Sequence, residues 1–343
     1  MRSRLLALCA GLLLLLAGCG RESLHSQESF VFGTRVEVLA WSNDEARARK
    51  ATAEVLREFD RLHRAYHAWQ PSELTALNDA IAAGRPHEVS AELAALIVEA
   101  QALAAQGEYL FDPGIGALVQ LWGFHDDSFK PRLPDAGKLA TLKKAKPSIA
   151  ALKVQGRQVA SANPSVALDF GGYLKGVALD RAAAIMKTHG IANALINIGG
   201  NVLALGSKGG QPWRVGIQHP RADQAGGAPL ATLDLRDGEA IGTSGDYQRY
   251  FELDGRRYSH LLDPRSAAPA LGTQALTVLI APREQAGLWS DVASKPLFVA
   301  GADWRRLATK LGITQVLRVD AAGRIEVTEA LRPRLKFEGG KAP

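Results

Sequence analysis

Apolar and polar residues alternate over residues 31–41 (VFGTRVEVLAW), and this period of two predicts a half-buried strand that Gly33 interrupts. The spacing of apolar residues then becomes that of a helix. We expect this helix to begin after a capping Asn43 and to continue to Trp69. Further helices are expected in segments 70–80, 91–106, 111–124 and 135–145, followed by two short strands within 149–161. The first half of the chain therefore combines short strands with several helices.

After residue 165 the pattern becomes strand, helix and strand, at 166–170, 172–189 and 193–199. Short strands follow, and the Asp254-Gly255 pair between two of them is a strong signal of a β-hairpin. The remaining expected elements are a buried strand at 275–281, helices near 285–300 and at 303–311, and a terminal hairpin through 320–324. The sequence thus predicts an α+β protein with mixed sheets and flanking helices.

Composition excludes some classes of function. The chain has 343 residues, 47% of them hydrophobic, so it is long enough to bury a substantial core. Its formal charge of +6 is spread along the sequence, with one short basic run at 138–146 that is typical of a solvated helix face. No basic stripe is interleaved with aromatic residues, so nucleic acid is not an expected partner.

The first residues are typical of a secreted lipoprotein. A basic start is followed by an apolar run that is short for a membrane span, and LAGC at 16–19 resembles a bacterial lipobox. We expect a signal peptide at 1–18, lipidation of Cys19 and a polar tether at 19–29, with an ordinary leader as the alternative. Because Cys9 would leave with the leader, no internal disulfide is expected. The predicted location is the periplasmic side of a bacterial membrane, inner or outer.

Three candidate sites receive little support from their spacing. His63 and His67 lie one helical turn apart, as zinc ligands do, but no third ligand is evident. Ser244 could form a hydrolase triad with His260 and Asp263, yet position 246 of GTSGD is aspartate where a nucleophile elbow has glycine. No G-x-G-x-x-G follows an N-terminal strand, which argues against a dinucleotide fold of the Rossmann type.

Five stretches, taken together, resemble one known family. They are VFGTRVEV (31–38), FDPGIGALVQLWGF (111–124), LDFGGYLKGVALD (168–180), INIGGN (196–201) and the segment GTSGDYQRYFELDGRRYSHLLDPR (242–265). In order and spacing they resemble the ApbE family, bacterial FAD:protein FMN transferases that are commonly lipoproteins. The resemblance covers about residues 30 to 325. It implies an ApbE-like domain over 30–335, followed by a tail at 336–343.

The third stretch has the chemistry that a dinucleotide requires. A lysine offers a point charge to phosphate, glycines let the backbone approach closely, and a helix N-terminus favours anions. The resemblance implies that Asp169 and Lys175 contact the flavin nucleotide and that the main chain of Gly172 is a metal ligand.

The resemblance also assigns further roles. Phe32 stands where the family usually has methionine, and Trp69 where it places an aromatic residue, for which a core position at the helix end is the alternative. The remaining implied nucleotide contacts are Leu110, Phe111, Asp112, Thr243 and Leu262, and the implied catalytic residues are Asp246, His260 and Lys175.

The implied reaction is a phosphoryl-type transfer. A threonine or serine hydroxyl of an acceptor flavoprotein attacks the FMN-side phosphorus of FAD, and AMP leaves. We expect His260 to accept the hydroxyl proton, since imidazole is well suited to that role near neutral pH. A FAD-binding lipoprotein without transferase activity and a FAD pyrophosphatase are the alternatives.

One segment departs from the family. Where the family has aspartate and, four residues later, threonine as magnesium ligands, this chain has Asp291 and Lys295, followed by Pro296. Lysine offers no oxygen to a hard cation, and at this spacing it is expected to pair with Asp291 on the helix. The proline is expected to bend the helix. Three hypotheses stay open: the ammonium replaces magnesium, magnesium binds more weakly through Asp291 and water, or the protein binds FAD without transferring FMN.

Overall fold

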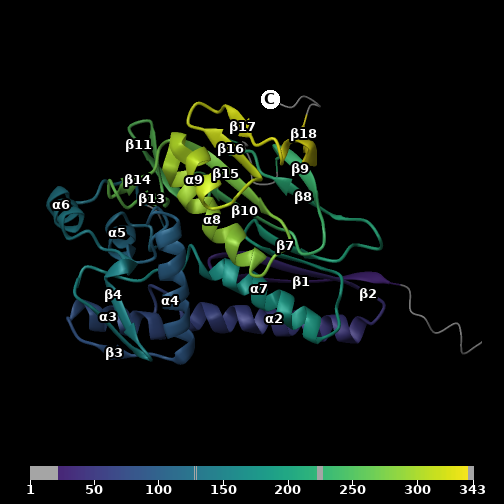
Figure 1. Ribbon diagram of the computed structural model, residues 1–343, viewed down its shortest axis with the longest axis horizontal. Helices are drawn as coiled ribbons and strands as arrows, with labels where there is room; N and C mark the ends of the chain where they lie inside the picture. Colours follow the sequence, from purple (N-terminus) through teal and green to yellow (C-terminus); the bar gives the residue numbers. More distant parts are fainter. Residues whose placement is uncertain (1–21, 127, 129, 222–226, 339–343) are drawn as a thin grey trace, which may run out of the picture.

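The computed structural model describes residues 22–126, 128, 130–221 and 227–338 (Figure 1). The predicted leader and Cys19 lie outside the described residues. An eight-stranded sheet, in the order β1-β2-β6-β7-β10-β15-β16-β17, forms the centre of the fold, and each pair of neighbouring strands is antiparallel. Its strands are β1 (Ser23–Val31), β2 (Thr34–Ser42), β6 (Ala194–Ile198), β7 (Asn201–Leu205), β10 (Ala240–Gly245), β15 (Thr273–Ile280), β16 (Val316–Asp320) and β17 (Ile325–Val327). The predicted α+β class is confirmed.

The two faces of the sheet are covered differently because side chains alternate along each strand. On β15, Leu276 and Val278 point into the main core, whereas Ala275 and Leu279 join a second cluster on the opposite face. The main core is shared with several helices, among them α2 (Glu45–Ala65), α7 (Leu174–Thr188) and α8 (Ala286–Ala300). The second cluster includes residues of a smaller sheet, β18-β9-β8, made of β8 (Trp213–Ile217), β9 (Ala231–Leu235) and β18 (Leu335–Phe337).

The remaining elements gather at one end of the molecule, where Figure 1 shows α4, α5 and α6 together with the short hairpins. The helices there are α3 (Glu73–Ala82), α4 (Ala91–Gln106), α5 (Gly116–Leu121) and α6 (Ala136–Ala145), and α9 (Trp304–Lys310) follows α8. The strands are β3 (His87–Glu88), β4 (Leu152–Gln155), β5 (Gln158–Ser161), β11 (Tyr250–Leu253), β12 (Arg256–Ser259), β13 (Leu262–Asp263) and β14 (Ala268–Pro269). A third apolar cluster around Trp122 and Phe251 joins α5 to the β11–β12 hairpin.

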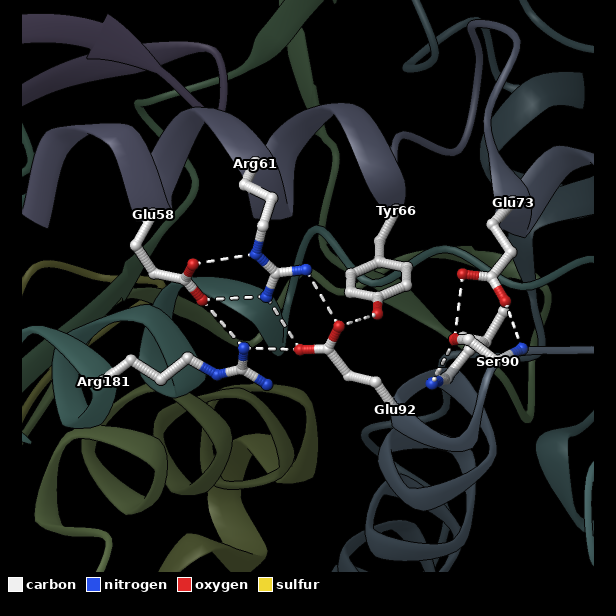
Figure 2. Close-up of polar contacts among 8 residues, drawn as sticks. Glu58, Arg61, Tyr66, Glu73, Ser90, Glu92 and Arg181 are labelled. Atoms are coloured by element: carbon white, nitrogen blue, oxygen red, sulfur yellow. Dashed lines mark hydrogen bonds and ion pairs between the residues drawn. The ribbon is translucent and has the colours of Figure 1, made fainter. Parts of the chain in front are cut away.

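A network of charged side chains ties the long helices together (Figure 2). Glu92 of α4 accepts hydrogen bonds from Arg61 of α2 at 2.8 Å and from the Tyr66 hydroxyl at 2.7 Å. Arg181 of α7 forms ion pairs with Glu92 and, at 2.8 Å, with Glu58 of α2. Three helices that are distant in sequence are therefore held in one arrangement. Among the described residues, no helix is both long and apolar enough to cross a membrane.

The N-terminal prediction requires a correction. Residues 31–41 form part of a hairpin, because Phe32 and Gly33 adopt positive φ angles of 57° and 68° and turn the chain between β1 and β2. Positive φ at both central residues is what a two-residue hairpin turn demands. Ser23–Val31 pairs along its whole length with β2, so most of the segment predicted as a tether belongs to the sheet and the domain begins before residue 30.

Smaller differences have local causes. The first long helix ends at Ala65 rather than Trp69, and the side chain of His67 accepts the backbone N–H of Trp69 in the turn that follows. Residues 166–170 are not a strand. Instead, the side chain of Asn78 bonds both backbone groups of Leu168.

At the C-terminal end, α8 continues through Pro296 to Ala300 as one helix. The predicted tail also starts later than residue 336, because β18 extends to Phe337.

The structure confirms two predicted helices, at 91–106 and near 135–145. It also confirms the hairpins through 254–255 and 320–324.

Candidate functional site

Helix α8 lies in close contact with α7 on one side and with β10 on another. A Cβ added to Gly176 of α7 would lie 2.7 Å from the Cα of Leu288 and 2.9 Å from the Cβ of Asp291. A Cβ added to Gly242 of β10 would lie 2.1 Å from the carbonyl oxygen of Ser290. Both glycines are therefore required by close packing, and together they bring the motifs at 168–180 and 242–246 to the same segment of α8.

Asp291 is the buried centre of this arrangement, with 1% of its surface exposed. Its carboxylate accepts hydrogen bonds from the backbone N–H of Gly176 at 3.0 Å, the side-chain amide of Asn201 at 2.8 Å and the ammonium of Lys295 at 2.5 Å. Burial raises the pKa of Asp291, but the charges of Lys295 and Lys175 and these hydrogen bonds outweigh it and leave the pKa below its usual value. Asp291 is therefore an ionised carboxylate with three donors.

Lys295 lies beside the glycine that the resemblance assigns to metal binding. A Cβ on Gly172 would come within 2.8 Å of the Lys295 Cε and 3.5 Å of the Phe111 ring. The Lys295 ammonium also donates to the carbonyl oxygen of Asp291 at 2.8 Å. The predicted pairing of Lys295 with Asp291 is confirmed. Burial is the main cause that lowers the pKa of Lys295, and Asp291 opposes it.

His260 follows β12 and is close enough to both lysines for their charges to act on it. Its Nδ1 lies 3.2 Å from the carbonyl oxygen of Arg249, which can only accept, so the Nδ1 carries the proton and Nε2 keeps its lone pair. Burial, then the positive charge of Arg249 and more weakly those of Lys175 and Lys295, lower the pKa of His260 to about 3. The imidazole is therefore neutral at physiological pH and has a lone pair on Nε2 that can accept a proton, although the low pKa makes it a weaker base than a free imidazole.

The GTSGD segment contributes residues that hold other groups in position. Thr243 shares a 2.9 Å hydrogen bond with Thr277, and Ser244 shares one of 2.8 Å with Ser294, the residue before Lys295. The carboxylate of Asp246 is engaged by both terminal nitrogens of Arg221, at 2.6 and 2.7 Å. Asp246 is therefore paired with an arginine, and its catalytic role stays a prediction.

Two further predicted carboxylates act on the backbone. Asp112 accepts from the N–H groups of Gly114 and Ile149, both at 2.8 Å, and so fixes the 111–116 loop against the chain at residue 149. Asp169 accepts from Gly171 at 2.8 Å and so shapes the turn before α7. Burial is the leading cause of the raised pKa of both groups.

The apolar residues of the prediction are more widely distributed. Leu110 and Phe111 are buried beside the Asp112 loop, and Leu262 belongs to the cluster around Trp122. Phe32 packs on Phe59 and His63 in the turn between β1 and β2, and Trp69 contacts the ring of His125. Of these five side chains, only Phe111 is placed beside the Gly172 and Lys295 region by a direct contact.

Two of the weakly supported candidates can be placed in the structure. His63 and His67 are in edge contact at 4.9 Å. Among the described residues, no group of three or more His, Cys, Asp or Glu side chains is arranged to hold a metal. The Ser244 hydroxyl bonds Ser294, and Asp263 pairs with Arg265, so neither acts on His260.

The donor set around Asp291 does not fit the magnesium ion that the resemblance implies. A hard cation needs several oxygen ligands, and here an ammonium lies 2.5 Å from one carboxylate oxygen and 2.8 Å from the main-chain oxygen of the same residue. The hydroxyl of Ser294 donates to that main-chain oxygen as well, at 2.9 Å. A metal at this position would have to displace Lys295.

Sequence reasoning missed several residues that organise the site. Asn201 and Gly176 bond Asp291, and Asp180 caps α8 by accepting from the N–H groups of Gly287 and Leu288 at 2.9 and 2.8 Å. Asn201, Gly176 and Asp180 lie in stretches that resemble the family, whereas Gly287 and Leu288 do not. Their place in those motifs was the available signal, but their structural role appears only when α7 and α8 are seen in contact.

A cavity of about 380 Å³ lies elsewhere, between α4, α7 and the start of α8, and its polar lining includes Glu92, Glu99, Arg181 and Gln285. Its polar groups are already engaged. Glu92 and Arg181 form the network of Figure 2, and Glu99 accepts from Gln285 at 2.5 Å. None of the predicted site residues lines it.

Comparison with known proteins gives consistent results. Residues 32–317 match the ApbE family. Over 98% of its length, the chain is 42% identical to a FAD:protein FMN transferase of Rhodobacter capsulatus, and it spans only 64% of that relative. It is 32% identical to a FAD:protein FMN transferase of Klebsiella pneumoniae, with 82% of each chain covered.

Solved structures show the same relationship. The ApbE protein of Thermotoga maritima superposes with a TM-score of 0.81 at 30% identity, covering 91% of this chain and 99% of that one. The flavinyl transferase ApbE of Pseudomonas stutzeri gives a TM-score of 0.77 at 27% identity, covering 93% and 98%.

Proposed function

The chain belongs to the ApbE family, and on that premise we propose that it is a FAD:protein FMN transferase. It would attach FMN from FAD to a threonine or serine of an acceptor flavoprotein and release AMP. Relatives that bear this name support the proposal. The observation in this chain that carries it is that two lysines link the motifs: Lys295 pairs with the buried Asp291, and the charges of Lys295 and Lys175 act on both Asp291 and His260.

The reaction needs a base and a positive environment more than it needs covalent participation of the enzyme. The acceptor hydroxyl oxygen forms a bond to the FMN-side phosphorus while the bond from that phosphorus to the bridging oxygen breaks, and AMP leaves with the bridging oxygen. Nε2 of His260 takes the hydroxyl proton, since its Nδ1–H is directed to the Arg249 carbonyl. Lys175, in the first turn of α7, and Lys295 face the negative charge of the diphosphate.

The other predicted contacts position the substrate. Asp169 and the Asp112 loop shape the backbone before α7 and α5, and Phe111 lies against the Gly172 region. Phe32 and Trp69 offer aromatic surface on which the flavin or adenine ring of FAD can stack without hydrogen bonds. Asp246 orients its loop through Arg221.

The proposal also includes the compartment. The LAGC motif supports lipidation of Cys19 and a location on the periplasmic side of a membrane, with the lipid as the only membrane contact. The acceptors would then be extracytoplasmic flavoproteins or membrane electron-transport subunits. Labelling cells with a fatty-acid analogue, with Cys19→Ala as the control, tests this part separately.

The activity is tested by incubating the protein with FAD and a threonine-bearing acceptor domain, with the Thr→Val acceptor as the control. A transferase adds FMN covalently to the acceptor and releases one AMP per FMN attached. Free FMN with AMP would instead identify a pyrophosphatase, and FAD binding without either product would identify a binding protein. We expect labelling of the threonine acceptor only, and a large loss of it in His260→Ala.

A further inference from the structure

We propose that Lys295 is a built-in replacement for the divalent cation, so that this chain binds FAD and transfers FMN without magnesium. The inference rests on the proposed function and deepens it, because it names the group that faces the diphosphate. It starts from a disagreement between the donor set of this site and the metal that the family resemblance implies.

The Lys295 side chain reaches both Gly172 and Asp291. Lys295 extends from α8 so that its Cε lies next to the backbone of Gly172 while its Nζ contacts Asp291. The resemblance assigns one metal ligand to the main chain of Gly172 and another to Asp291. The lysine head therefore occupies the space between the two groups that would otherwise hold the ion.

Asp291 already accepts three hydrogen bonds. Its Oδ2 accepts from Gly176, and its Oδ1 accepts from both Asn201 and Lys295. Neighbouring hydroxyls add no free ligand, since Ser294 donates to the Asp291 carbonyl and shares a hydrogen bond with Ser244. An entering cation would have to remove a buried ammonium and then find oxygen ligands that this cluster does not supply.

Lysine and magnesium give this position different net charges. A magnesium ion with Asp291 would give a net charge of +1 at this point, whereas the ammonium with Asp291 gives zero. Lys175 adds one positive charge close by in either case. Replacing Lys295 by threonine should therefore leave a net charge of −1 without metal and +1 with it, so the variant should depend on magnesium while the natural chain does not.

The decisive measurement is FAD affinity, followed by flavin fluorescence, for the natural chain and Lys295→Thr in EDTA and in millimolar magnesium. We expect the natural chain to bind equally in both. We expect Lys295→Thr to lose affinity about tenfold or more in EDTA, as for a lost hydrogen bond to a charged group, and to recover it in magnesium. A natural chain that needs magnesium, or a Lys295→Thr variant that binds normally in EDTA, would overturn the inference.

The FMN-transfer assay run beside it separates this inference from the proposed function. Transfer by the natural chain in EDTA supports both. Absence of transfer in both conditions overturns the proposed function, while the affinity comparison still decides the role of Lys295. Transfer that appears only with magnesium overturns the inference alone.

Two further variants exclude trivial explanations. Lys310→Thr removes a lysine that pairs with Glu108 at 2.9 Å on the surface, and should leave both readouts unchanged. If Lys295→Thr does not fold, Lys295→Met keeps a long side chain without the charge and carries the comparison in EDTA. Unchanged FAD affinity in Lys295→Met would overturn the inference.

Discussion

The side-chain amide of Asn201 donates a 2.8 Å hydrogen bond to Asp291, and this contact joins the first residue of β7 to the middle of α8. Both residues are almost fully buried, with 2% and 1% of their surfaces exposed. Bulk water therefore has little access to either partner. The hydrogen bond fixes the carboxylate of Asp291, which Lys295 and Gly176 also contact. The position of the Lys295 ammonium therefore depends on Asn201, which lies 90 positions before Asp291.

Asn201→Ala should lower the free energy of unfolding by about 1–3 kcal/mol, because it leaves a buried carboxylate oxygen with one donor fewer. Urea unfolding measures this loss. Asn43→Ala, at an exposed position before α2, is the control and should change stability by less than about 0.5 kcal/mol. Equal stabilities of the two variants would contradict the role given to Asn201.

Asp291→Ala should be more damaging than the removal of both charges. The single change leaves the Lys295 ammonium without its carboxylate partner in a largely buried position, at an expected cost of about 3–5 kcal/mol. The double variant Asp291→Ala with Lys295→Met removes both charges and should recover part of that loss. Denaturant unfolding of the two single variants and the double variant gives the coupling energy. Strict additivity would mean that the two side chains do not interact.

Gly176→Ala should destabilise the protein and reduce FMN transfer together. Its Cβ would come within 2.7 Å of the Leu288 backbone and would separate α7 from α8 where Asp291 is bound. Gly137→Ala on α6 is the matched control, since its Cβ would meet only a side-chain oxygen of Asp135, at 3.3 Å. Alanine is the better helix former by about 1 kcal/mol, so the control should be neutral or stabilising. Comparable melting temperatures for the two variants would contradict the close-packing argument.

Local sequence patterns predicted the elements whose signals are themselves local. The helix capped by Ser90 begins at Ala91 and the one capped by Asp135 begins at Ala136, as those residues imply. Strand β1 was missed because its residues are mostly polar and exposed, and what makes Ser23–Val31 a strand is the partner strand β2. Pairing of this kind is tertiary information that a hydrophobic pattern does not contain.

The sequence predicted individual residues of the site but not the long-range hydrogen bonds that join them. The spacing of Asp291 and Lys295 on one helix was enough to predict their pairing. The donors from Gly176 and Asn201 come from positions 115 and 90 residues away, and only the order of strands and helices brings them together. The pairing of Asp246 with Arg221 was not predicted for the same reason, because Arg221 lies on another segment.

Glu92 provides a prediction that concerns stability alone. Hydrogen bonds from Arg61 are the largest of the causes that lower the pKa of Glu92 to about 2, so its contribution is present above pH 4.5 and is lost as the pH falls toward 2. Glu92→Gln should therefore cost about 1–2 kcal/mol at pH 7 and less in acid. FMN transfer at 25 °C should be unchanged, because the network of Figure 2 includes none of the site residues. Glu88→Gln, at an exposed pair with Arg157, is the control and should have little effect.

The pKa of His260 determines how FMN transfer is expected to depend on pH. Burial, with the positive charges around it, lowers its pKa from 6.5 to about 3. In the folded protein the imidazole therefore stays neutral as the pH falls from 8 to 5, and a general base of this kind should give FMN transfer without an acidic limb near pH 6.5. Titration of the His260 ring by NMR measures the pKa directly, and a value near 6.5 would contradict the prediction.

The same shift has a consequence for folding. The unfolded chain takes up a proton on His260 below pH 6.5 and the folded chain does not, so stability should fall as the pH decreases from 6.5 toward 3. Between pH 6.5 and 5 the loss should reach about 2 kcal/mol. His260→Gln removes this term, so its stability should depend less steeply on pH than that of the natural chain. Urea unfolding at pH 7.5 and 5 compares the two, and parallel pH dependences would mean that the folded protein protonates His260 normally.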